Sequence, residues 1–242
     1  SNHKIICDEK KSIATITINA PDKMNAIELE MWAEIYTVMS RLSNDNSIRV
    51  VIFKGEGSKA FSSGADISRF AEERFNSKQA KNYASSGFLK GLEAVSSFPK
   101  PVLSLIQGYC VGGGIELAAA TDIRIAGENC MFGIPAAKLG LVAGHKELRH
   151  FVQKIGPSKT IEMLFTGRLF TSKEMFSAGF LSQIVPAVST VSSQIVPEVA
   201  IELSQKSLAT SITHFLTSSN IFAPYYFFLN QFNGFTLSAT FS

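Results

Sequence analysis

Cysteine is scarce in this sequence, which holds three in 242 residues: Cys7, Cys110 and Cys130. An odd number of widely separated cysteines argues against a disulfide framework and lacks the spacing of a metal site. We therefore expect reduced thiols, a cytoplasmic location and no bound metal. The sequence has no run of about 18 apolar residues, so we expect no membrane span. It also lacks a basic segment followed by an apolar one near its start, so we expect no signal peptide.

The sequence also has no large excess of positive or negative charge. The sequence has 23 basic and 20 acidic residues, and no stripe of Lys or Arg interleaved with aromatic side chains. A net charge of +3 is too small to indicate a nucleic-acid partner, and we expect none. With 45% hydrophobic residues, the chain can bury one sizeable core, alone or with a small helical appendage.

The spacing of apolar residues alternates between strand and helix through most of the chain. Apolar residues alternate with threonine over 14–18, which predicts a strand, whereas residues 28–42 have the spacing of a helix. The same criteria predict further strands over 50–53, 102–106 and 122–126, and further helices over 79–97, 112–120, 148–155 and 158–165. Thr171 and Glu174 have the spacing of a capping box, for a short helix that Gly179 ends. This alternation predicts the α/β class.

The last quarter of the chain, residues 187–242, has a different composition. It contains three charged residues, and aromatic residues crowd its final part. Such a surface would not stay exposed on a soluble monomer, so we expect a helical region that is packed internally or against another subunit. Contact with a membrane, or a peculiarity of this tail, is the alternative interpretation.

Two glycine-marked turns carry the clearest chemical signal. The three glycines over 112–114 follow a predicted strand and open a predicted helix, where no side chain obstructs a sharp turn. The first amides of a helix lack intrahelical partners and carry the positive end of its dipole, so an oxyanion is stabilised there. The segment 61–68 (FSSGADIS) also follows a strand and exposes backbone amides. Taken singly, the glycines over 112–114 are also compatible with a tight structural turn, and the segment 61–68 with a loop in which Ser62 or Ser63 caps the next helix.

Together with other segments in the same order, these turns resemble the enoyl-CoA hydratase/isomerase (crotonase) family. The resemblance covers roughly residues 3–186 and rests on PDKMNA at 21–26, GADI at 64–67, GGGIEL at 112–117, DIRIA at 122–126, FGIP at 132–135 and TGR at 166–168. It implies a crotonase-like ββα spiral over 3–186 that carries an acyl-CoA site. It also implies that the helical region 187–242 assembles the subunits into a trimer or hexamer.

The resemblance assigns roles around the two turns. The backbone amides of Ala65 and Gly113 are implied to hold the thioester oxygen of an acyl-CoA as it becomes an oxyanion. Glu116, about one helical turn beyond Gly113, is implied to deprotonate the water that adds to a 2-enoyl-CoA. The alternative is an ordinary carboxylate favoured by the positive helix end. No separate cofactor is implied, because coenzyme A enters as part of the substrate.

The resemblance further implies a channel for coenzyme A. Lys23, Met24 and Ala26 are implied to form the wall that receives its adenine and pantetheine, and Asp66 and Ile67 are implied to line the same channel. Lys23 is either a partner of the CoA phosphates or an ordinary solvated charge.

The sequence departs from the family pattern beside the expected site. Ala136 stands where hydratases and isomerases of the family usually carry a second glutamate, and its loss is expected to cost a factor of about 10²–10⁴ in rate. His145 and Glu147 stand where small residues usually line the acyl pocket. Either one replaces the missing acid if it faces inward, or both are solvated residues at the start of a helix. The tail also lacks the family's Lys/Arg-rich ending, which normally packs near CoA.

We therefore expect an acyl-CoA enzyme, with enoyl-CoA hydratase as the first hypothesis. An isomerase, thioesterase or decarboxylase is the first alternative, because these reactions pass through the same oxyanion and can use Glu116 alone. The second alternative is a non-catalytic acyl-CoA-binding subunit that lost turnover with Ala136.

Overall fold

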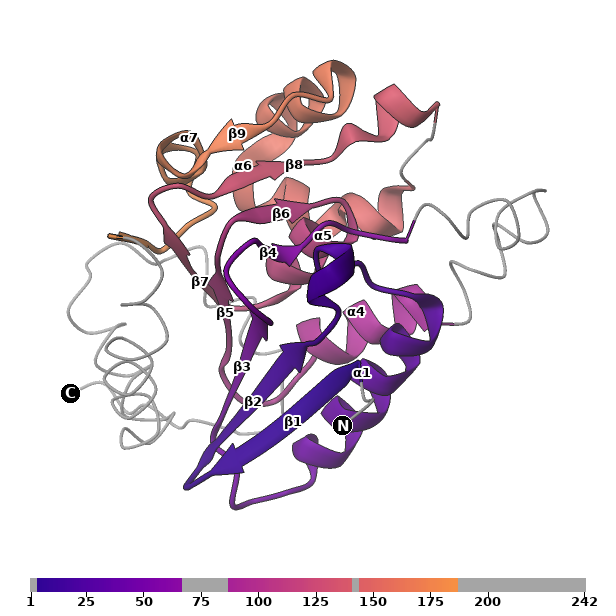
Figure 1. Ribbon diagram of the computed structural model, residues 1–242, viewed down its shortest axis with the longest axis vertical. Coiled ribbons are helices and arrows are strands. Elements are labelled where there is room, and N and C mark those ends of the chain that lie inside the picture. The colour runs from indigo at the N-terminus through magenta and orange to yellow at the C-terminus, as the bar shows by residue number, and fades with distance from the viewer. Residues whose placement is uncertain (1–3, 67–86, 141–143, 187–242) are drawn as a thin grey trace, which may run out of the picture. The chain divides into compact units, whose positions relative to one another are not determined.

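The computed structural model describes residues 4–66, 87–140 and 144–186, without the side chains of 145–147 (Figure 1). All of these residues belong to one compact unit of the chain, Ser1–Ser204. The predicted C-terminal region 187–242 lies outside the described residues.

The described residues form two β-sheets, and the chain alternates between them from residue 50 to residue 133. The larger sheet has the order β1-β2-β3-β5-β7-β10 and is parallel except for the antiparallel β1–β2 pair. The smaller sheet has the order β4-β6-β8-β9. The strands of the larger sheet are β1 (Ile5–Lys10), β2 (Ile13–Ile18), β3 (Val50–Gly55), β5 (Val102–Ile106), β7 (Ile123–Gly127) and β10 (Gln183–Val185). Those of the smaller sheet are β4 (Ala60–Ser62), β6 (Tyr109–Val111), β8 (Met131–Gly133) and β9 (Phe170–Thr171).

Two successive pairs of strands, each with one strand from either sheet, lead into helical structure and so form turns of a spiral. Strands β5 and β6 lead into α5 (Gly113–Ala120), while β7 and β8 lead through the 3-10 helix η4 (Pro135–Leu139) into α6 (His145–Thr166). The remaining helices are η1 (Pro21–Lys23), α1 (Leu29–Ser43), α4 (Leu89–Ser96) and α7 (Ser172–Ser177). Helix α5 lies at the centre of the helices in Figure 1 and is almost wholly buried. The predicted α/β class and ββα spiral are confirmed.

The predicted elements agree with the structure wherever the pattern was long. The helices predicted over 28–42 and 112–120 are α1 and α5, and the strand predicted over 102–106 is β5. The helix predicted over 79–97 is observed as α4 at its C-terminal end, and residues 79–86 lie outside the described residues. The two helices predicted over 148–155 and 158–165 form the two arms of α6. They are separated by Gly156 at φ 75°.

The predicted capping box is present at the start of α7. The amide of Glu174 donates to the Thr171 hydroxyl over 3.3 Å, and the amide of Thr171 donates to the Glu174 carboxylate over 2.8 Å. Gly179, at φ 80°, lies directly after the capping residue of this helix. Glycine adopts this left-handed conformation without steric cost, so it ends the helix as predicted.

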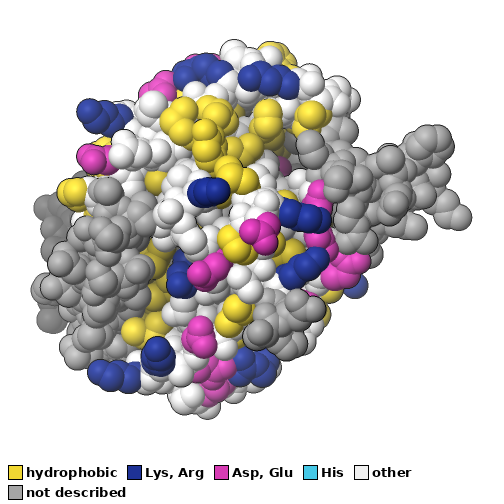
Figure 2. Space-filling model, in the orientation of Figure 1, with side chains coloured by type: hydrophobic (Ala, Val, Ile, Leu, Met, Phe, Trp, Pro, Cys, Tyr) yellow, Lys and Arg dark blue, Asp and Glu magenta, His cyan; other side chains and the backbone are white. Residues whose placement is uncertain are grey.

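Several large apolar side chains remain exposed within the described part of the chain. Phe165 is 80% exposed, and Tyr36, Tyr109, Leu139, Ile161 and Phe176 are between 42% and 50% exposed. Figure 2 shows hydrophobic side chains gathered in the upper part of one face. The described helices include none that is both long enough and apolar enough to cross a membrane.

Candidate active site

The two glycine-marked turns meet in space, although about fifty residues separate them in the sequence. Strands β4 and β6 pair in parallel, with Ser62 opposite Cys110, so the turns that follow them lie side by side. A Cβ atom added to Gly64 would lie 2.9 Å from the carbonyl oxygen of Val111 and 3.1 Å from the amide nitrogen of Gly113. Gly64 also has φ 94°, a conformation that L side chains rarely adopt. Glycine at position 64 therefore permits the close approach of the two backbones.

The amides of Ala65 and Gly113 lie next to each other at the start of α5. A Cβ atom on Gly113 would lie 3.9 Å from the amide nitrogen of Ala65. Neither of these amides donates a hydrogen bond to any other described residue, whereas the neighbouring amides of Gly64 and Gly112 do. The sequence prediction that these amides come together therefore agrees with the geometry. Two free donors beside the positive end of a helix can hold an oxygen that gains negative charge.

Buried aromatic rings support this pair of amides. The Trp32 ring meets the Phe88 ring edge to face, with their centroids 4.9 Å apart. Both rings lie within 4 Å of the Cβ position of Gly113. On the other side, a Cβ atom on Gly114 would lie 2.6 Å from the carbonyl oxygen of Ser62, so α5 rests directly on the end of β4. Because close packing surrounds the turn, its amides are held in place before any ligand arrives.

Ser62 and Ser63 are both engaged near the turn itself. The Ser62 hydroxyl accepts a hydrogen bond from the amide of Gly64 over 3.1 Å, and the Ser63 hydroxyl donates to the carbonyl of Lys23 over 3.3 Å. The residues that directly follow this segment, 67–86, lie outside the described residues, so the predicted cap of the next helix stays a prediction.

Glu116 lies in the first turn of α5, where its side chain is only 8% exposed. Its immediate neighbours Ile115 and Leu117 are fully buried. A carboxylate withdrawn from water costs free energy that a surface carboxylate does not, so burial disfavours the interpretation of Glu116 as an ordinary helix residue. The structure therefore places a potential proton acceptor one helical turn from the free amide of Gly113.

Ala136 lies in η4 and packs partly buried against the core. Its methyl group has no acidic proton to transfer, as the sequence indicated. His145 and Glu147 lie in the first turn of α6, but their side chains lie outside the described part, so their suggested role as a substitute acid stays a prediction.

The segment predicted to hold coenzyme A is joined to the glycine turn. The amide of Ser63 donates to the carbonyl of Met24 over 2.9 Å, and the amide of Ile27 donates to the carbonyl of Gly64 over 2.7 Å. These bonds place Lys23, Met24 and Ala26 beside the segment that contains Asp66, while Ile67 lies outside the described residues.

Lys23 has acidic partners already. Its ammonium group lies 2.7 Å from the Asp66 carboxylate and 3.5 Å from the Glu28 carboxylate. The hydrogen bond and the charge of Asp66 raise the pKa of Lys23. The side chain is 55% exposed, so water screens these interactions.

Asn25 is a structural residue of this segment that sequence analysis did not single out. Its side-chain amide donates to the carbonyls of Ala60 and Glu56 over 2.7 and 2.9 Å, and its oxygen accepts from the amide of Ala20. It also has φ 55°, which asparagine tolerates better than most residues. Met24 before it has φ 54°, so this turn contains two consecutive residues in the left-handed conformation.

A ββα spiral in which two free amides lie side by side at the start of a buried helix is a crotonase-like architecture. The sequence model of the enoyl-CoA hydratase/isomerase family matches residues 8–222, and this chain belongs to that family. A solved enoyl-CoA hydratase/carnithine racemase from Magnetospirillum magneticum superposes with a TM-score of 0.83 at 34% identity, covering 90% of this chain and 81% of the other.

Curated relatives support the same family. A crotonyl-CoA hydratase from Syntrophomonas wolfei is 29% identical over 75% of this chain, and a probable mitochondrial enoyl-CoA hydratase from Dictyostelium discoideum is 33% identical over 74% of it. The matched part spans 68% and 62% of the length of these two relatives, so about a third of each has no counterpart in the match.

Proposed function

We propose that this protein adds water to the double bond of a 2-enoyl-CoA. The observation that carries the proposal is the pair of free amides, of Ala65 and Gly113, beside the buried carboxylate of Glu116. Hydration needs both parts, because the thioester oxygen gains negative charge while water loses a proton. The family and the hydratases among its relatives support the same reaction.

The proposed reaction follows from these groups. The thioester oxygen accepts hydrogen bonds from the amides of Ala65 and Gly113, which polarises the conjugated double bond. Glu116 takes a proton from water as the water oxygen bonds to the β-carbon, and the electrons of the double bond move to form an enolate. With Ala136 in η4, the proton that the α-carbon then gains comes from the protonated Glu116 or from solvent. Glu116 ends as a carboxylate in both cases: it gives its proton to the α-carbon, or it releases that proton to solvent when solvent protonates the α-carbon.

Coenzyme A is proposed to lie along the segment 23–26 and to pass Asp66 and Ile67. Lys23 is proposed to mark the edge of this channel, and its pairing with Asp66 and Glu28 limits how much it adds to phosphate binding. No cofactor is required beyond coenzyme A in the substrate. Assembly into a trimer or hexamer and a cytoplasmic location stay predictions.

The primary test is turnover of crotonyl-CoA by the purified protein. Loss of the conjugated enoyl absorbance, with formation of 3-hydroxybutyryl-CoA, is the expected result. If the protein shows no turnover but still binds coenzyme A thioesters in calorimetry, the result would instead favour a non-catalytic binding subunit. A different product from an acyl-CoA would favour the isomerase, thioesterase or decarboxylase alternative, which Ala136 supports.

Replacing Ala136 by glutamate is expected to raise the rate of crotonyl-CoA hydration, by up to about 10²–10⁴-fold if the new carboxyl group reaches the α-carbon. The physical reason is that a positioned acid then supplies the proton that Ala136 cannot. The matched control is Ala137→Glu, which adds the same charge one residue away at an exposed position. Equal rates for both variants would show that position 136 does not face the reacting carbon.

A further inference from the structure

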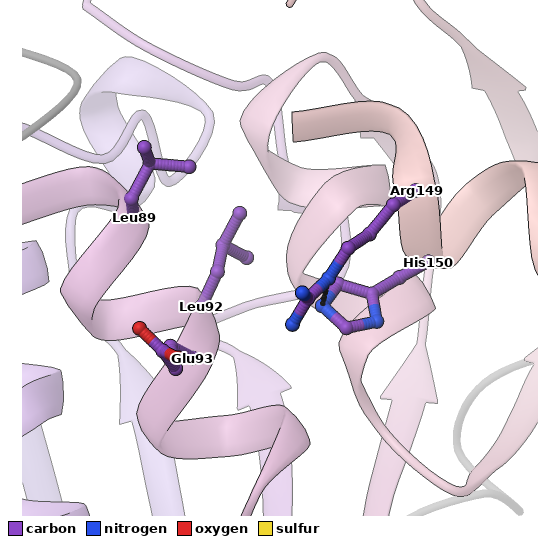
Figure 3. Close-up of a pocket in the computed structure, with 5 residues that line it drawn as sticks. All are labelled: Leu89, Leu92, Glu93, Arg149 and His150. Atoms are coloured by element: carbon purple, nitrogen blue, oxygen red, sulfur yellow. Dashed lines mark hydrogen bonds between the residues drawn. The ribbon is translucent and has the colours of Figure 1, made fainter. Parts of the chain in front are cut away.

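A pocket of about 180 Å³ lies between helices α4 and α6. Leu89, Leu92 and Glu93 line it from α4, and Arg149 and His150 line it from α6. Figure 3 shows the side chains of Arg149 and His150 projecting from α6 toward α4. The pocket thus combines apolar side chains with three polar ones.

The guanidinium group of Arg149 has no acidic partner among the described residues. Its only hydrogen bond there runs from Nε to the His150 Nε2 atom, over 3.2 Å (Figure 3). Accepting this bond requires a lone pair on Nε2, so His150 is neutral in this arrangement. Burial, followed by the positive charges of Arg149 and Lys154, lowers the pKa of His150, while Glu93 across the pocket raises it. The α6 side of the pocket is therefore electropositive and offers hydrogen-bond donors.

Helix α4 connects the pocket with the candidate active site. Phe88, which packs against Gly113, immediately precedes Leu89 at the start of α4. Glu93 lies five residues after Phe88, about 7.5 Å along a helix axis. Helix α5, which begins at Gly113, packs against both α4 and α6. The pocket therefore lies between the two helices that pack against α5.

We infer that the pocket between α4 and α6 binds a carboxylate at the far end of the acyl group, and that Arg149 is the residue that holds it. The inference rests on the proposed acyl-CoA function and specifies its substrate class, a dicarboxylic acyl-CoA. Arg149 is exposed in the structure, and its guanidinium can give a carboxylate two parallel hydrogen bonds that an uncharged alkyl chain cannot accept. Glu93 repels the same carboxylate from the α4 side and so directs it to α6.

Binding of unreactive thioesters tests the inference without requiring turnover. Calorimetry compares two pairs of equal chain length, valeryl-CoA with glutaryl-CoA and hexanoyl-CoA with adipoyl-CoA. In the wild-type protein, at least one dicarboxylic member is expected to bind about tenfold more tightly than its uncharged partner, as a charge-assisted hydrogen bond provides. Arg149→Gln is expected to abolish this preference and leave the uncharged thioesters unchanged, which also shows that the variant is folded. Arg49→Gln, at an exposed arginine in another segment, serves as the control.

Glu93→Gln tests the sign of the electrostatic argument. Removing this negative charge is expected to tighten the binding of the dicarboxylic thioester several-fold without changing the uncharged one. Equal affinity within both pairs, or an Arg149→Gln variant that weakens both members alike, would overturn the inference and leave the acyl-CoA function intact. Failure of every thioester to bind would overturn the proposed function together with it.

Discussion

Replacing Glu116 by glutamine is expected to lower kcat for crotonyl-CoA hydration by about 10²–10⁴, the contribution of a positioned general base. Glutamine has the same size and keeps one carbonyl oxygen for hydrogen bonding, so the buried position in α5 stays filled. It cannot accept the proton that water loses. Because the thioester and coenzyme A contacts do not involve this side chain in the proposed mechanism, KM is expected to change little. Steady-state kinetics on crotonyl-CoA measures both parameters.

Glu34→Gln is the matched control for this prediction, because it makes the same chemical change at an exposed position on α1. Wild-type kcat in the control shows that the loss follows from the buried site. An unchanged kcat in Glu116→Gln would remove Glu116 from the mechanism. The reaction would then need another base, and Glu147 would be the first residue to examine by the same substitution.

The larger elements of the fold could be predicted because each one carries its own pattern. Helix α1 buries one face and exposes the other, and β2 alternates threonine with apolar residues, so the spacing alone specifies them. The smaller sheet has no such pattern. Its strands are two or three residues long, and their pairing with strands distant in sequence defines them. Local periodicity carries no information about pairing of that kind.

The candidate site, too, could be predicted only in part from the sequence. The glycines indicated where backbone amides are exposed, and the family resemblance indicated which two belong together. Their proximity arises from the parallel pairing of β4 with β6, which is a property of the folded chain. The pocket between α4 and α6 could not be predicted, because Glu93 and Arg149 are ordinary charged residues in sequence. They lie on two helices that only the spiral brings together.

Replacing Gly64 by alanine is expected to lower kcat for crotonyl-CoA by about 10²–10³, the usual effect of losing one oxyanion donor. Backbone amides cannot be removed by ordinary substitution, but their separation can be changed. The new methyl group would lie 2.9 Å from the carbonyl of Val111 and 3.1 Å from the amide of Gly113, closer than carbon atoms normally approach such groups. The turn must therefore open, which moves the amide of Ala65 away from that of Gly113. Kinetics on crotonyl-CoA measures the loss.

Gly57→Ala separates this effect from backbone strain. Gly57 has φ 72° and Gly64 has φ 94°, so alanine at either position costs about 1–2 kcal/mol of folding free energy through its conformation alone. Among the described residues, no atom lies within 4 Å of a Cβ placed on Gly57, so that variant is expected to leave the active site undisturbed. Chemical denaturation is expected to show a loss of stability in both variants, while kcat falls only in Gly64→Ala. Wild-type kcat in a folded Gly64→Ala protein would mean that the two amides do not hold the thioester oxygen, because their relative position would have changed without consequence for the reaction.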